Sequence, residues 1–231
     1  MNTSENSPRT AIEILDEMAD TAVDAFPTPQ QAAERALPIY HATGIPKRYR
    51  APWPRPQDPW WVAKLATLAD KMREGGLVAL IGNRGTGKTR MAAECVRDVC
   101  PQQAHYTTAM GLFLRIRATY NKSRGEIGES ESEVIREISK IPLLVIDEIQ
   151  ERGGTAWEDR LLTHIIDKRY GAERATILIA NLTQSGLVDS IGDSITSRLF
   201  ETGGIIEFTG PSFRVGEVER PGQINLEFSK P

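Results

Sequence analysis

The sequence predicts an α/β fold in which a five-stranded parallel sheet lies between layers of helices. Three observations lead to this prediction. Apolar runs of strand length alternate with segments of helical periodicity. A glycine-rich loop separates the first run from the helix that follows it. Two later runs end in polar side chains, which would meet at one edge of a parallel sheet.

Composition sets the size and class of the protein. The 231 residues are 40% apolar and 26% charged, which suits one globular domain with extensions. The chain shows neither an apolar run of membrane-spanning length nor an opening signal peptide, so we expect a cytoplasmic protein without a membrane partner. Cys95 and Cys100 have no His/Cys cluster around them, which favours core positions in a reducing compartment over a zinc site.

Charge is unevenly distributed along the chain, although the net value is only −3. Residues 1–40 carry two basic and seven acidic side chains, residues 41–125 carry fifteen and five, and residues 126–231 carry eleven and nineteen. A basic middle section between acidic ends predicts a local site for a polyanion. Solvated helix faces explain the excess equally well.

Residues 1–43 are predicted to form a helical extension. Thr10 and Glu13 have the spacing of a capping box, and the apolar residues that follow recur at helical intervals until Pro27. A second helix in the same style follows Pro27. The stretch GIPKRYRAPWPRPQDPWW is rich in proline and aromatic residues, so it is predicted to be a linker or a wrapped segment.

Residues 44–215 are predicted to form the main domain, and residues 216–231 a loose polar tail. A helix from Trp60 should lead to the first strand, Leu77–Ile81. The other predicted strands are His105–Thr108, Leu143–Ile146, Thr176–Ala180 and Gly204–Phe208. Predicted helices between them are Met110–Tyr120, Glu131–Ser139, Ala156–Tyr170 and a short helix after Asn181.

The stretch LVALIGNRGTGKTR contains the spacing G-x-x-x-x-G-K-[ST] of a phosphate loop. Glycines let backbone N–H groups turn toward phosphate oxygens, and the following helix adds its positive N-terminus. We therefore predict a nucleoside triphosphate site, in which Lys88 neutralises β/γ-phosphate charge and Thr89 holds Mg²⁺. The candidate nucleotide-binding residues are Gly82, Asn83, Arg84, Gly85, Thr86, Gly87, Lys88, Thr89 and Arg90.

The stretch PLLVIDEIQ ends an apolar run in Asp147 and Glu148. Asp147 suits Mg²⁺, directly or through water, and Glu148 suits the orientation and deprotonation of an attacking water. The alternative is a strand that merely ends in two acids. The phosphate-loop lysine 59 residues upstream argues against that alternative.

Two further candidates follow later in the chain. ATILIANLT ends a strand in Asn181, whose amide could hold the attacking water against the γ-phosphate. SITSRLFETGG carries Arg198, which could reach the γ-phosphate of a neighbouring subunit. Each signal is weak alone, because asparagine often ends strands and arginine is common on surfaces.

These motifs in this order resemble the AAA+ ATPases and, within them, the DnaC/IstB group. The resemblance covers roughly residues 44 to 214 and lies in GIPKRYR, IGNRGTGKTRMAAE, LLVIDEIQ, IIDKRY, ILIANLT and SRLFE…IIEFTGPSFR. It implies that the Walker A, Walker B, sensor 1 and arginine-finger residues are Lys88, Thr89, Asp147, Glu148, Asn181 and Arg198.

The sequence departs from the group in three places. Asn83 and Arg84 occupy variable loop positions, and Gln150 stands where a glycine is common. The chain ends soon after Arg214, so we expect no C-terminal lid domain and assign no sensor 2 arginine.

The resemblance implies a slow, Mg²⁺-dependent ATPase that loads a replicative ring helicase onto single-stranded DNA and assembles through its ATPase domain. The N-terminal helices would bind the helicase, and their divergence suits a phage or mobile-element protein. Open alternatives are a transposase helper, a small-molecule P-loop kinase and a binding module with negligible turnover. The tryptophans at 53, 60 and 61 could cover adenine or pack at the domain edge. Candidate DNA contacts, each of which could equally be a solvated helix face, are Arg115, Arg117, Lys122 and Arg124.

Overall fold

The computed structural model describes residues 44–50, 58–121, 128–210 and 212. Several predictions lie outside this part of the chain. They concern the N-terminal extension, the tail from residue 216, Trp53, Lys122, Arg124 and Arg214.

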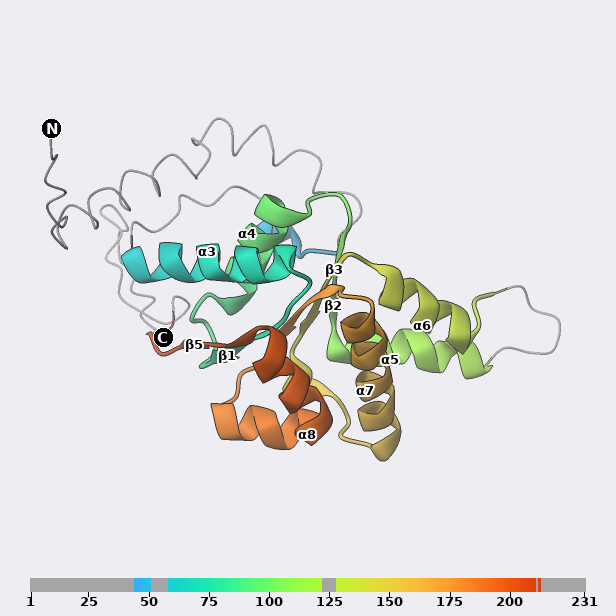
Figure 1. Cartoon of the computed structure of the whole chain (residues 1–231). Coiled ribbons are helices and arrows are strands. Elements are labelled where there is room, and N and C mark those ends of the chain that lie inside the picture. The colour runs from blue at the N-terminus through green and yellow to red at the C-terminus, as the bar shows by residue number, and fades with distance from the viewer. Residues whose placement is uncertain (1–43, 51–57, 122–127, 211, 213–231) are drawn as a thin grey trace, which may run out of the picture.

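A five-stranded parallel sheet forms the centre of the molecule, as the sequence predicts (Figure 1). Its strands are β1 (Leu77–Gly82), β2 (Ala104–Thr108), β3 (Leu143–Asp147), β4 (Ala175–Ile179) and β5 (Gly204–Phe208). They lie in the order β2-β3-β4-β1-β5, and each neighbouring pair is parallel. The observed ends differ from the predicted ones by one residue at most, because apolar runs fix buried strands well.

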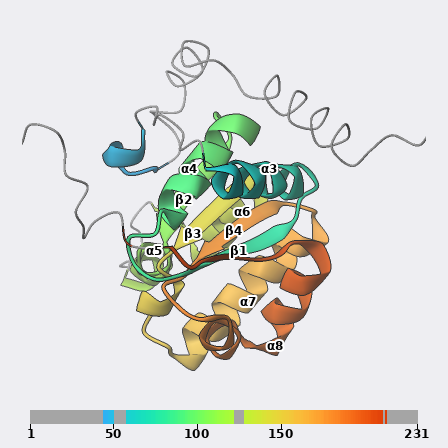
Figure 2. The same cartoon turned by 90° about the vertical axis from the view of Figure 1, so that its left-hand side faces the viewer.

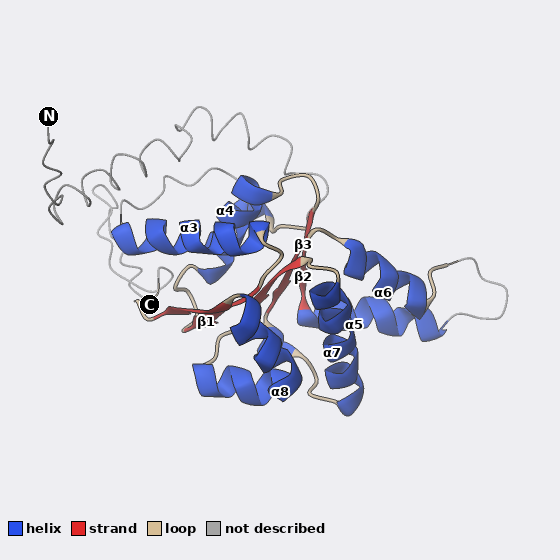
Figure 3. Cartoon of the chain, in the orientation of Figure 1, coloured by secondary structure: helices blue, strands red, loops and turns tan. Residues whose placement is uncertain are grey.

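Helices cover both faces of the sheet, which gives three layers (Figures 2 and 3). On one face lie α3 (Pro59–Arg73) and α4 (Lys88–Val99). The helices on the other face are α5 (Ala109–Ala118), α6 (Glu131–Lys140), α7 (Ala156–Gly171) and α8 (Gln184–Thr202). Short 3-10 turns occupy Lys47–Tyr49, Thr119–Asn121 and Ile149–Glu151.

Side-chain caps set the starts of all these helices except α4. The Asp58 side chain accepts from the Trp60 N–H at the start of α3, where Pro59 takes the first helical position. Complete capping boxes begin α6 and α7, from Ser130 and Thr155 respectively. Sequence periodicity therefore located these helices to within one or two residues.

The strands alternate their side chains between two cores, because successive residues of a strand point to opposite faces. Ala79 and Ile146 pack toward α5–α8, whereas Val78 and Val145 pack toward α3 and α4. Trp61 also belongs to this second core and contacts the Phe208 ring edge-on, with centroids 6.2 Å apart.

The last helix differs from the prediction. A short helix was expected before Arg198, but α8 spans Gln184–Thr202 and changes direction at Gly192, where φ is 76°. A glycine adopts this left-handed conformation without strain, so two helical segments run into each other there. Arg198 lies inside the second segment, not after a short helix.

Two features of composition can be checked in the described part of the chain. None of its helices has the length and apolar character needed to cross a membrane. The thiol of Cys95 is buried, that of Cys100 is half-buried, and both are free.

Candidate nucleotide-binding site

The phosphate loop follows β1 at the carboxyl edge of the sheet and requires its glycines. Gly82 has φ of 123°, and a Cβ there would lie 2.2 Å from the Phe208 carbonyl oxygen of neighbouring β5. Gly85 and Gly87 also have positive φ values, 83° and 98°. The loop can therefore turn tightly and pass directly into α4, which begins at Lys88.

Lys88 is folded back into this loop. The residue is only 5% exposed to solvent. Its Nζ donates to the carbonyl oxygens of Gly82 at 2.8 Å and Asn83 at 2.6 Å. The ammonium group thus lies within the loop whose backbone N–H groups would bind a phosphate.

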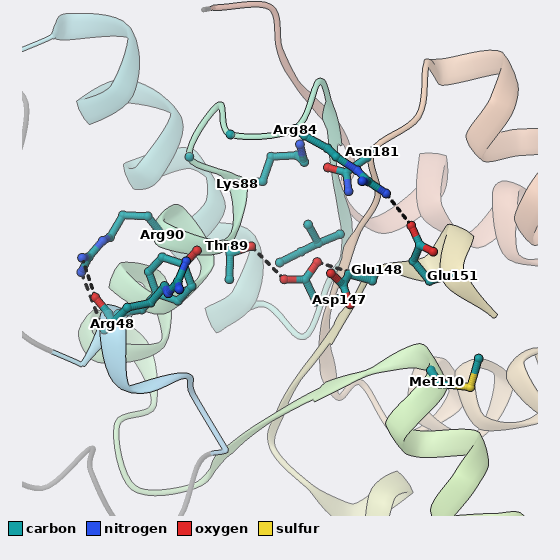
Figure 4. A pocket seen from close by; sticks show the side chains of 14 residues that line it. Arg48, Arg84, Lys88, Thr89, Arg90, Met110, Asp147, Glu148, Glu151 and Asn181 are labelled. Atoms are coloured by element: carbon teal, nitrogen blue, oxygen red, sulfur yellow. Dashed lines mark hydrogen bonds and ion pairs between the residues drawn. The ribbon is translucent and has the colours of Figure 1, made fainter. Parts of the chain in front are cut away.

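A cavity of about 1120 Å³ opens in front of the loop (Figure 4). It is lined by Arg48, Tyr49, Arg84, Gly85, Gly87, Lys88, Thr89, Arg90, Met110, Asp147, Glu148, Glu151, Ile179 and Asn181. The structure therefore brings the predicted loop, acidic pair and asparagine together around one space. Gly82, Asn83 and Thr86 belong to the loop without lining the cavity.

Asp147 ends β3 and faces α4. Its Oδ2 accepts hydrogen bonds from the hydroxyls of Thr89 and Tyr106, each at 2.8 Å, and its Oδ1 accepts from the Glu148 N–H at 2.7 Å. Carboxylate and hydroxyl oxygens are hard donors of the type that Mg²⁺ prefers, so Asp147 and Thr89 fit a Mg²⁺ site. Tyr106 was not among the residues singled out from sequence.

The phenol of Tyr106 remains a hydrogen-bond donor at this position. Burial, followed by the neighbouring carboxylates of Asp147 and Glu148, raises the pKa of Tyr106 above its ordinary value. The hydroxyl is therefore protonated throughout the physiological pH range, and Asp147 receives its hydrogen bond continuously.

Glu148 has a left-handed backbone, with φ of 57° and ψ of 45°. Such a conformation costs a non-glycine residue of order 1–3 kcal/mol. Its exposed side chain lines the cavity beside Asp147. The strained turn thus directs the two acids differently, with Asp147 held by hydrogen bonds and Glu148 open to solvent in the cavity.

Gln150 links the acidic turn to the end of β4. Its Oε1 accepts from the backbone N–H of Asn181 at 3.0 Å, a contact that the glycine common at this position could not make. The sequence shows the glutamine at this position but not its contact with residue 181. The position of Asn181 at the cavity is thereby tied to the turn that carries Glu148.

Arg84 lines the cavity and forms an ion pair with Glu151, which also lines it. Its Nη2 lies 2.7 Å from Glu151 Oε1, and the two side chains are 72% and 46% exposed. An ion pair this exposed contributes at most about 1 kcal/mol. The pair can therefore open at little cost when an anion enters.

The segment 44–50 forms another wall that the sequence did not assign to the site. Arg90 Nη2 donates to the Arg48 carbonyl oxygen at 3.1 Å, and its guanidinium lies 5.3 Å from the centre of the Tyr49 ring. The phosphate-loop helix thus carries the side chain that positions this segment. Trp60 and Trp61 contact Phe208 and do not line the cavity, which supports the packing interpretation.

Arg198 does not line this chain's own cavity. Its Nη1 donates to the carbonyl oxygen and the hydroxyl of Ser194, both at 2.6 Å. Its Nη2 lies 3.1 Å from Asp167 Oδ1, and its guanidinium covers the Tyr170 ring. Intramolecular contacts therefore hold the side chain of this α8 residue against α7.

The two described DNA candidates lie on α5 and have different surroundings. Arg115 contacts Glu129 Oε1 at 2.8 Å and Glu137 Oε2 at 2.5 Å. Arg117 lies 5.2 Å from the centre of the Trp157 ring and 3.6 Å from Glu158 Oε1, and its side chain is more exposed than that of Arg115. Arg117 therefore presents more of its charge to solvent than Arg115 does.

Known proteins share this sequence pattern and fold. The family model of the IstB-like ATP binding protein matches residues 49–219. Uncharacterized protein YdaV of Escherichia coli K12 is 27% identical over 165 residues, which cover 70% of this chain and 64% of YdaV. Replicative helicase loader DnaC of the same strain is 25% identical over 130 residues, 54% of this chain and 51% of DnaC. The chain thus spans less than two thirds of these relatives.

Solved structures support the fold. A crystal structure of the DnaC helicase loader superposes with a TM-score of 0.57 and 17% identity, covering 71% of this chain and all of that one. AMPPCP-bound DnaA from Aquifex aeolicus gives 0.56 and 17%, covering 71% of this chain and 51% of that one. At these identities the likeness shows the AAA+ fold alone. The family match covers well over half of the sequence, so the chain belongs to the IstB-like ATP-binding family of DnaC/IstB-type AAA+ proteins.

Proposed function

We propose that the protein hydrolyses ATP and uses it to load a replicative ring helicase onto single-stranded DNA. The observation that carries the proposal is the cavity, where the phosphate loop, Asp147, Glu148 and Asn181 meet. Similarity to a curated protein named replicative helicase loader supports the choice of process.

Each group in the cavity has a defined task in this proposal. Lys88 and the loop N–H groups bind the β- and γ-phosphates, while Thr89 and Asp147 hold Mg²⁺. Bound Mg²⁺ supplies positive charge that neutralises the phosphate oxygens. Glu148 orients and deprotonates the attacking water, and the Asn181 amide holds that water in line.

Arg198 is proposed to complete the site of a neighbouring copy. The guanidinium does not line its own cavity, so a role in hydrolysis requires it to reach the γ-phosphate of another subunit. Mixing Arg198→Ala with Lys88→Ala subunits should restore part of the ATPase activity that each variant lacks, because one supplies the loop and the other the finger. Mixed assemblies that remain inactive would remove Arg198 from the mechanism.

Helicase capture tests the process. The full chain with ATP should retain the replicative helicase of its host, and a chain without residues 1–42 should bind ATP equally well and retain no helicase. The acidic, amphipathic pattern of that extension is the reason for assigning it to partner binding. Full retention by the shortened chain would contradict the assignment.

A transposase helper is the second candidate, and the IstB-like family match favours it. The two functions differ in partner and in DNA. A loader should prefer single strands, with contacts proposed from Arg117, Lys122, Arg124 and, more weakly, Arg115, which is paired with two carboxylates. Preference for duplex DNA together with retention of a transposase would replace the loader proposal.

A further inference from the structure

Tyr106 reaches the acidic end of β3 from the neighbouring strand. In the β2–β3 register Tyr106 lies opposite Val145, and Asp147 follows two residues later on the same face. Diagonal neighbours at this spacing are within reach of a long aromatic side chain. The hydroxyl spans the gap and donates to Asp147 Oδ2 at 2.8 Å.

Three donors hold the Asp147 carboxylate, and they have different origins. Thr89 is itself a candidate metal ligand, and the N–H of Glu148 belongs to the adjacent residue. Tyr106 alone among these three is anchored on another strand. Its hydrogen bond therefore ties Oδ2 of the carboxylate to the neighbouring strand.

The surroundings of Tyr106 keep its phenol in place. The ring packs against the core between the sheet, α3 and α4. The segment 44–50 covers its backbone so closely that a Cβ on Gly44 would lie 2.3 Å from the Tyr106 carbonyl oxygen. A donor supported on these sides can orient a ligand, because little freedom remains to be lost when the ligand binds.

We propose that Tyr106 is a positioning residue of the metal site, whose hydroxyl orients Asp147 toward the divalent cation that accompanies ATP. The inference rests on the proposed function, because it needs Asp147 to serve the cation. It concerns affinity for the cation and not for the nucleotide, since Tyr106 does not line the cavity. Partners of metal ligands typically change metal affinity by about 10–100-fold when removed.

The test compares the full-length wild type with Tyr106→Phe, which removes only the hydroxyl. Thr107→Val is the matched control, because it removes a hydroxyl from the next residue of β2, where it donates to the Thr108 carbonyl oxygen. Mn²⁺ affinity is measured by electron paramagnetic resonance with a non-hydrolysable ATP analogue present. Affinity for the analogue is measured separately in EDTA.

Tyr106→Phe should raise the Mn²⁺ dissociation constant about tenfold, with analogue affinity in EDTA within about twofold of wild type. Thr107→Val should match the wild type in both measurements. Unchanged Mn²⁺ affinity in Tyr106→Phe would overturn the inference, and so would an equal loss of analogue affinity in EDTA.

A second variant and a measurement on the wild type distinguish failure of this inference from failure of the proposed metal site. Tyr106→Leu, a second apolar replacement, carries the same expectation if Tyr106→Phe fails to fold. A wild type that binds the analogue equally well with and without Mn²⁺ would refute the proposed metal site itself. A wild type whose binding depends on Mn²⁺, together with unchanged Mn²⁺ affinity in Tyr106→Phe, would refute only the role of Tyr106.

Discussion

The two edges of the sheet each hold a buried cation bonded to main-chain carbonyls, but the surroundings differ. At the carboxyl edge, Lys88 bonds to carbonyls of a glycine loop and lines the cavity. At the amino edge, Arg169 of α7 is fully buried and does not line that cavity. Lys88 therefore lies beside an open cavity, whereas Arg169 is surrounded by protein.

Arg169 donates hydrogen bonds to α6, to the connection that follows α6, and to β4 at the amino edge of the sheet. Its Nη1 donates to the carbonyls of Ile138 and Ile141 at 2.8 and 2.7 Å, and its Nη2 to that of Ala175 at 2.5 Å. Its Nε donates to the Thr176 hydroxyl at 2.9 Å. Burial lowers the pKa of Arg169 to about 9, so the group remains charged at neutral pH. Lys88 lines a cavity and Arg169 does not, so burial of a cation does not by itself mark a ligand site.

Replacing Lys88 should have the largest effect and should separate binding from stability. Lys88→Ala loses contacts to two phosphates, each worth roughly 1.5–3 kcal/mol, so ATP affinity should fall roughly 10²- to 10⁴-fold. The free energy of unfolding should change by at most about 1 kcal/mol, because Lys88 lines the cavity and water there can replace its hydrogen bonds. Calorimetry and urea unfolding measure the two quantities.

The control for this prediction is Lys140→Ala, which removes an exposed lysine at the end of α6. It should alter neither quantity. ATP affinity of Lys88→Ala within tenfold of wild type would show that the carboxyl-edge lysine is structural, like Arg169.

Glu148→Gln should reduce turnover by about 10²–10⁴ while ATP binding persists, because a positioned base is lost and its shape is kept. Glu151→Gln is the matched control, since it removes a second carboxylate from the cavity and leaves Glu148 in place. Single-turnover hydrolysis with preloaded ATP measures the difference. Equal rates in the two variants would mean that Glu148 has no role as a base.

The carboxyl edge could be predicted from sequence because its chemistry is local. The loop spacing, the paired acids and the apolar strands before them are contiguous patterns, and parallel strands bring their ends together. Contacts of Gln150 with Asn181 and of Tyr106 with Asp147 join residues 31 and 41 positions apart. No pattern within one segment encodes such pairs.

The amino edge escaped prediction for a related reason. Arg169 lies in the stretch IIDKRY, which contributed to the family resemblance, yet periodicity alone places an arginine at the end of a helix on the surface. Its acceptors are carbonyls, which every residue carries, so composition gives no sign of them. The turn of α8 at Gly192 was missed similarly, because a glycine within a helical pattern does not reveal its φ.

Arg169→Met should destabilise the fold without directly affecting the cavity. The substitution leaves several buried carbonyls unsatisfied, and the expected loss is about 3 kcal/mol in the free energy of unfolding. Urea denaturation measures it, with Lys168→Met as a control that removes a neighbouring exposed cation of α7. ATP affinity of the folded fraction should equal that of the wild type. Wild-type stability in Arg169→Met would remove the contrast between the two edges.

The smallest expected effect lies at Thr176, the partner of the Arg169 Nε. Thr176 is buried in β4, and its hydroxyl also contacts the Arg174 carbonyl oxygen at 3.2 Å. Thr176→Val keeps the shape of the side chain and should cost about 1 kcal/mol. It loses the hydrogen bond from Arg169 and a longer one to the Arg174 carbonyl oxygen, while three carbonyls still hold the guanidinium.

A double-mutant cycle then decides whether Arg169 and Thr176 act together. In the Arg169→Met background the guanidinium is already absent, so Thr176→Val should cost less than it does alone, by about 0.5–1 kcal/mol. The effect of the hydroxyl would then depend on the arginine, as the 2.9 Å contact implies. Full additivity in the cycle would mean that the hydroxyl serves the Arg174 carbonyl instead, and that the main-chain carbonyls alone hold Arg169 at the amino edge.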